Sequence, residues 1–241
     1  MCYPNNTYIC KSFYYLIMHK FRYLLVIALA FASSYILKGQ ENEVMVGLRG
    51  GYNASFGGFA SASIETHQTL RENFMISGGL QYKTIGTTAV EARPAYIKDF
   101  QWGRIGAECL LSYTNLLSVN SMAIGAGAVY TGKWIGAKLG YFYRSFGSKG
   151  DSITEPFNIY YEICANFLPM REDWDLEFII TNNEMFELER HYQPTFIMQG
   201  RYLLKDHIGV SMGIGCEPAG MFHMSADYYE SYLKLGVCYR W

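Results

Sequence analysis

His223, Ser225 and Asp227 are the side chains near the C-terminus whose types match a base, a nucleophile and an acid. They occupy alternate positions, so an extended chain places all three on one face. Residues i and i+2 of a strand lie about 7 Å apart, at ~3.4 Å per residue. A nucleophile and its base must approach to ~2.6–3.2 Å. We therefore expect no triad from these three alone and predict a polar rim beside a strand end.

The other histidines beyond residue 40 do not form a metal-binding pattern. His67, His191 and His207 lie far apart in the sequence, and none recurs at the spacing typical of metal ligands. His191 does lie beside Glu187, Glu189 and Arg190 in a segment that we expect to be an outer loop. We predict no metal site, no cofactor and no catalytic residue.

The segment Asn182–Glu189 is acidic and carries apolar residues that would be exposed in a loop. One interpretation is contact with a partner or weak binding of a divalent cation. The favoured interpretation is a solvated loop, because surface charge clusters are usually no more than that.

The elements that would position these residues are clearest in the last thirteen residues, Tyr229–Trp241. Every second residue is apolar or aromatic, which is the period of a strand with one apolar face. The apolar positions are Leu233, Leu235, Val237, Tyr239 and Trp241, and those between them are Tyr232, Lys234, Gly236, Cys238 and Arg240.

The same alternation recurs along the chain. Strong examples begin at Val44, Phe74, Ile105, Ile135, Phe157 and Ile208. Weaker examples lie near residues 58–66, 89–98, 119–130, 174–181 and 194–204. With the last strand the prediction is about twelve strands, within a range of roughly 10–14. The 21 Tyr residues suit strands, and Gly recurs inside the apolar segments.

The connections between these strands alternate in length. If both termini lie in the periplasm, one set of turns is mostly tight, and the other contains the two longest connections, Phe146–Glu155 and Asn182–Tyr192. Short periplasmic turns and longer outer loops are typical of outer-membrane barrels.

The closing strand resembles that of Gram-negative outer-membrane β-barrels, which end on an aromatic residue that serves as an assembly signal. The resemblance implies a closed, antiparallel, up-and-down transmembrane β-barrel, contact with outer-membrane lipid and the barrel-assembly machinery, and a place in the outer membrane. Phe is the commoner last residue in this class, whereas this chain ends on Trp241. The predicted assembly signal comprises Leu233, Leu235, Val237, Tyr239 and Trp241.

An exported soluble β-sandwich that binds a ligand is the alternative fold, since its strands also alternate. Aromatic residues at the ends of apolar strand faces favour the membrane barrel instead, because they match the interfacial girdle.

The first 39 residues have the features of a leader. Lys20 and Arg22 precede an apolar run from Tyr23 to Leu37 that is too short for a membrane helix and suits a cleaved signal peptide. Met18 is an alternative start, and an uncleaved anchor is the alternative interpretation. We predict a leader over residues 1–39 and a barrel over 40–241. The barrel is acidic, because four of the 20 Lys and Arg residues and none of the 21 Asp and Glu residues precede Glu41, so we expect no nucleic-acid partner.

The polar strand faces predict a lumen with charges of both signs. Two functions follow for a barrel of this size: a rigid structural barrel held by ion pairs, which we favour, or a narrow path for a small polar solute. A barrel enzyme acting on lipid or peptide through rim residues such as His191 and His223 is the alternative, and the oligomeric state stays open. The predicted lumen charges are Arg49, Glu91, Arg93, Arg104, Glu108, Lys138, Arg144, Glu162, Arg201, Glu230, Lys234 and Arg240.

Overall fold

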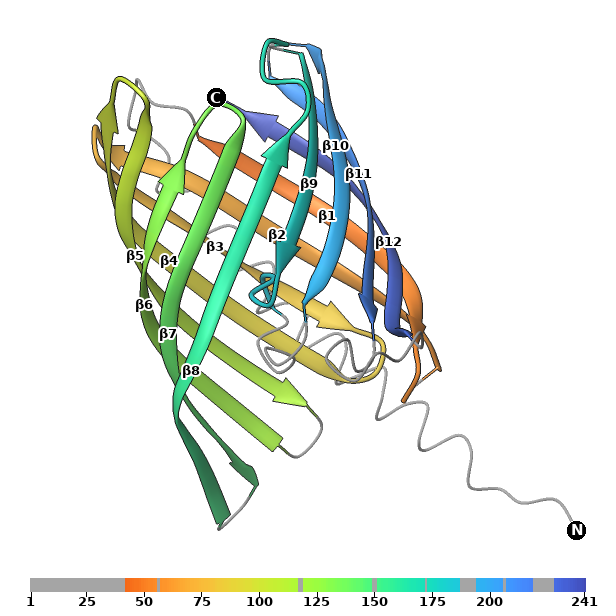
Figure 1. Ribbon diagram of the computed structural model, residues 1–241. Coiled ribbons are helices and arrows are strands. Elements are labelled where there is room, and N and C mark those ends of the chain that lie inside the picture. Colours follow the sequence, from red (N-terminus) through yellow and green to blue (C-terminus); the bar gives the residue numbers. More distant parts are fainter. Residues whose placement is uncertain are drawn as a thin grey trace, which may run out of the picture. The chain divides into compact units, whose positions relative to one another are not determined.

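Twelve antiparallel strands close into one barrel in the computed structural model (Figure 1). The structure describes residues 42–55, 57–116, 119–148, 151–171, 173–186, 194–205, 207–218 and 228–241. The predicted leader, His191, His223, Ser225 and Asp227 lie outside these residues. None of the described residues belongs to a helix long and apolar enough to cross a membrane.

Each strand pairs with its sequence neighbours, and the last strand pairs with the first. The strands are β1 (Glu43–Asn53), β2 (Gly57–Arg71), β3 (Phe74–Lys83), β4 (Thr87–Phe100), β5 (Gly103–Leu116), β6 (Val119–Thr131), β7 (Ile135–Ser148), β8 (Asp151–Asn166), β9 (Trp174–Thr181), β10 (Thr195–Lys205), β11 (Ile208–Pro218) and β12 (Tyr228–Arg240). The predicted fold class and strand number are therefore confirmed.

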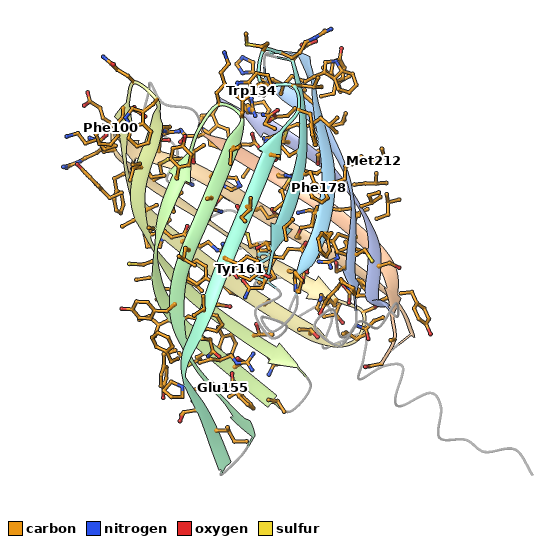
Figure 2. All side chains as sticks on the ribbon, viewed as in Figure 1. Phe100, Trp134, Glu155, Tyr161, Phe178 and Met212 are labelled. Atoms are coloured by element: carbon orange, nitrogen blue, oxygen red, sulfur yellow. The ribbon has the colours of Figure 1, made fainter. Side chains whose placement is uncertain are left out.

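The outward face of the barrel is apolar, as the alternation predicts. On β12 the side chains of Leu233, Leu235, Val237 and Tyr239 are exposed, whereas Cys238 between them is buried. Met212 of β11 points away from the barrel (Figure 2) and is 61% exposed. Exposed apolar side chains on so many strands form a continuous apolar outer surface, which soluble monomers rarely show.

Aromatic rings gather at the end of the barrel where β1 begins and β12 ends, which we call the terminal end. Phe100 and Trp134 lie at this end in Figure 2. Trp174 packs against Tyr202 with 4.6 Å between ring centroids, and Tyr239 stacks on Trp241 at 5.8 Å. This arrangement matches one girdle of the interfacial aromatics that anchor barrels in a bilayer.

One predicted loop is wrong. Residues 146–155 were expected to connect two strands, but β7 continues to Ser148 and β8 begins at Asp151. The pairing between β7 and β8 continues as far as Ser148 and Asp151, so most of the expected loop is paired strand. Their far ends extend beyond the neighbouring strands in Figure 1. By contrast, β8 pairs with β9 only from Glu162 to Asn166.

Candidate functional site: a plugged lumen with a cavity

The chain that follows β9 turns into the lumen instead of remaining outside. Asn182 starts this turn, and its side chain forms hydrogen bonds with the main chain of β8. Its Oδ1 accepts a 2.7 Å hydrogen bond from the Tyr161 amide, and its Nδ2 donates to the Ile159 carbonyl at 3.0 Å. The preceding Thr181 donates its hydroxyl to the Tyr161 carbonyl at 3.0 Å. These contacts end the β8–β9 pairing and direct the next residues inward. We call Asn182–Phe186 the plug.

The expectation that Asn182–Glu189 forms a solvated loop is therefore wrong for its described part. Asn183 is 1% exposed and Phe186 is 2% exposed. Phe186 has a φ of +70°, a left-handed conformation that is uncommon for a bulky residue and needs support from its surroundings. A Cβ on Gly79 of β3 would lie 2.9 Å from Cζ of Phe186, so the absence of a side chain there makes room for the ring.

Two buried charges of β4 hold the plug at its main chain. The Arg93 guanidinium donates through Nη2 to the carbonyl oxygen and to Oδ1 of Asn183, both at 3.1 Å. Glu91 accepts a 3.0 Å hydrogen bond from the Phe186 amide and forms an ion pair with Arg93. Both side chains are at least 95% buried, and the pair therefore satisfies polar groups that water cannot reach.

Strands β1 and β12 hold the plug from the other side. Glu184 accepts from Arg49 at 3.2 Å and from the Tyr232 hydroxyl at 2.8 Å. Arg49 also pairs with Glu230 at 2.7 Å, and its guanidinium lies 3.4 Å from the centroid of the Tyr232 ring. We call Arg49, Glu91, Arg93, Glu184 and Glu230 the far-end cluster. A small pocket of about 10 Å3 adjoins its members Arg49, Glu184 and Glu230.

Between the plug and the terminal end the lumen is hollow. This terminal-end cavity has a volume of about 500 Å3, and Asn183, Glu184 and Met185 of the plug form part of its lining. Its walls carry ion pairs between neighbouring strands: Lys138 with Glu162 at 2.9 Å, and Lys234 with Glu65 at 2.8 Å.

Arg201 and Glu43 form a third set of ion pairs in the lining of this cavity. Arg201 pairs with Glu43 at 2.9 Å and with Asp175 at 3.6 Å, and Glu43 also accepts a hydrogen bond from Arg240 at 2.6 Å.

The remaining predicted lumen charges take separate positions. Glu108 of β5 lies opposite Ala95, near enough to Arg93 of β4 to act on its charge, and it accepts a hydrogen bond from the Tyr160 hydroxyl at 3.1 Å. Arg104 lies opposite Asp99 and pairs with it at 2.9 Å near the terminal end, where both side chains are more than 40% exposed.

Arg144 pairs with Glu155 at 2.9 Å, and the Glu155 label lies toward the far end of the barrel in Figure 2. Glu155 was expected at the end of a loop, so the alternation did not mark it as a lumen charge.

Sequence reasoning also missed Glu43, Glu65, Glu177 and Glu184 as lumen residues. Glu65 and Glu177 lie in segments with weak alternation, and Glu43 precedes the first clear apolar position. Glu184 carried no signal at all, because nothing local marks a loop residue that folds inward.

The described histidines do not build a catalytic site. His207 contacts the carbonyl oxygen of Arg240 through Nδ1 at 3.0 Å and lies beside the Tyr239 ring. His67 lines the terminal-end cavity. Across the described ranges, no group of three or more His, Cys, Asp or Glu side chains is arranged to hold a metal ion. Cys109, Cys164, Cys216 and Cys238 are free thiols.

Comparison with known proteins supports the fold alone. No family model matches the sequence, and no curated protein matches it. Among solved structures, the chain is similar to the translocator domain of the autotransporter NalP from Neisseria meningitidis, with a TM-score of 0.53, 12% identity and coverage of 96% of this chain and 98% of that one. It is also similar to the NanC porin, with a TM-score of 0.52, 12% identity and coverage of 80% of this chain and 98% of that one. The KdgM porin in complex with disordered oligogalacturonate has a TM-score of 0.51 and 12% identity, with coverage of 81% of this chain and 98% of that one. The chain thus has the fold of outer-membrane β-barrels.

Proposed function

We propose that this protein is an outer-membrane barrel whose lumen admits small polar solutes and is closed by the plug. One observation carries the proposal: on the terminal side of the plug the lumen holds a cavity of about 500 Å3 lined by charged side chains, and the plug itself is buried at Asn183 and Phe186. The terminal end would face the periplasm, as expected from the short turns there, and the far end would face outward.

The apolar outer surface and the aromatic girdle support placement in a bilayer. A cleaved signal peptide over the first 39 residues would deliver the chain to the periplasm, and the assembly machinery would insert it. Porins are among the barrels similar in fold, which is consistent with solute passage but does not name the solute.

The way the plug is attached supports a gate. Its described contacts with β1, β4 and β12 are made by side chains, through Arg49, Glu91, Arg93 and Tyr232. Side-chain contacts of this kind can break without disrupting the strand ladders that close the barrel.

Planar-bilayer recording of the purified full chain tests the proposal. We expect low conductance for the natural chain. Replacing Asn183–Phe186 by Gly-Ser-Gly-Ser should give stepwise openings severalfold larger. Unheated and boiled samples should differ in electrophoretic mobility for both proteins, which verifies that the variant forms a barrel. Equal, silent recordings from two folded proteins would show a closed structural barrel instead.

A further inference from the structure

The terminal-end cavity has a charge imbalance that its own side chains do not neutralise. Six carboxylates contribute to its lining, against four Lys and Arg side chains. The carboxylates are Glu43, Glu65, Glu162, Asp175, Glu177 and Glu184, and the cations are Arg93, Lys138, Arg201 and Lys234.

Each of these cations is already engaged by a carboxylate. Lys138 pairs with Glu162 and Lys234 pairs with Glu65. Arg201 pairs with Glu43 and Asp175, and Arg93 pairs with Glu91. An anionic solute in the cavity would therefore have to compete with these carboxylates for the cations.

Glu177 of β9 is the carboxylate that lacks a cationic partner. Its Oε2 accepts a 2.7 Å hydrogen bond from Nε2 of Gln199. Among the described residues no Lys or Arg side chain pairs with Glu177. A carboxylate in a confined lumen is stabilised by a counter-ion, because neutral donors only partly replace the water it has lost.

A second polar group without a partner lies in the same lining. His67 lines the cavity, and neither of its ring nitrogens has a hydrogen-bond partner within the described part of the chain. An imidazole without a partner can form a hydrogen bond with a hydroxyl group of a ligand.

From these observations we infer that the terminal-end cavity binds a small protonated amine that also carries hydroxyl or carbonyl oxygens, such as an amino sugar. The ammonium group neutralises Glu177, and a ligand hydroxyl forms a hydrogen bond with His67. A volume of about 500 Å3 is within the range of small-molecule sites and holds one such ligand. The ligand enters from the terminal end, because the plug closes the other side. This inference names the solute class of the proposed function and rests on it.

Calorimetric titration of the full chain in detergent, with the plug in place, tests the assignment. Glucosamine, glucose and glucuronate have similar size but positive, neutral and negative charge. We expect glucosamine to bind at least tenfold more tightly than the other two. Equal binding of all three sugars, or tighter binding of glucuronate, would overturn the assignment.

Variants of the site provide a second test of the assignment. Glu177→Gln should weaken glucosamine binding at least tenfold, whereas Asp99→Asn, which removes one negative charge at an exposed position, should not change it. Gln199→Lys places an ammonium group beside Glu177 and should abolish glucosamine binding even if the first variant folds poorly. Unchanged binding in the folded Gln199→Lys protein would refute the site. Because the titration needs no conductance, a silent bilayer recording would count against the pore and leave this result standing.

Discussion

The two halves of the lumen use the same types of charged residue, but the Glu91–Arg93 pair of one half and the Lys138–Glu162 pair of the other are buried to different degrees. In the far-end cluster the Glu91 and Arg93 side chains are 0% and 5% exposed. In the terminal-end cavity Glu162 and Lys138 are 21% and 27% exposed. The difference comes from the plug, which brings main-chain donors and acceptors to the first pair, whereas the second pair faces open space.

The difference in burial separates residues that stabilise the barrel from residues that a solute can reach. A buried charge loses much when its partner is removed, because no water can replace the partner. A partly exposed pair is solvated and screened, so it contributes little to stability. The far end of the lumen should therefore hold the barrel and its plug together, while the terminal end should tolerate change and receive solute.

The largest expected effect is the loss of Arg93. Arg93→Ala leaves Glu91 buried without its cation and removes two hydrogen bonds to Asn183, so it should lower the free energy of unfolding by ~3–5 kcal/mol. Lys138→Ala at the terminal-end cavity, where both partners of the ion pair are partly exposed, should cost about 1 kcal/mol or less. Urea unfolding in lipid vesicles measures both. If the two losses are equal, burial does not distinguish the halves.

A pair of glycines on β7 tests the difference in packing. A Cβ at Gly140 would lie 2.4 Å from the Tyr160 ring and 2.5 Å from the Ala126 carbonyl oxygen, while a Cβ at Gly136 would meet nothing closer than 3.6 Å. Gly140→Ala should destabilise the barrel by ~1–3 kcal/mol through overpacking. Gly136→Ala should change stability by less than about 0.5 kcal/mol. The same unfolding measurement applies, and a harmless Gly140→Ala would mean that this wall can relax.

Glu184 tests how tightly the plug is held. Glu184→Gln removes the charge that Arg49 and Tyr232 engage, a loss of ~1.5 kcal/mol for a charge-assisted hydrogen bond. That loss should raise the ratio of open to closed channels about tenfold in single-channel recording. Asp99→Asn, which removes a carboxylate at an exposed position near the terminal end, should leave the ratio unchanged. A similar rise in both variants would place the gate elsewhere.

The smallest effect should come from the Lys138–Glu162 pair. A double-mutant cycle with Lys138→Ala and Glu162→Ala should give a coupling energy of about 0.2–1 kcal/mol that vanishes in 1 M salt. Coupling above about 2 kcal/mol that persists in salt would show that this pair is as shielded as the far-end cluster.

The strands could be predicted because their signal is local. In β12 each apolar residue from Leu233 to Tyr239 faces outward, as its position in the alternation requires. The same rule placed Glu230 and Lys234 inward. It left open which of the seam charges Arg49 would take as its partner. Arg49 lies opposite Lys234 but pairs with Glu230, because that choice depends on side-chain reach across the closed seam.

The sequence by itself determined which face of each strand is apolar, and through this the barrel, because a period of two is set by the geometry of the extended backbone. Only the tertiary structure decided what the lumen contains. The plug carries no periodic pattern, and its position depends on Arg49, Glu91, Arg93 and Tyr232, which come from strands far apart in the sequence. Those side chains converge only after the barrel closes, so no local window of residues could reveal the plug, the cavity that it covers or the unbalanced charge of Glu177.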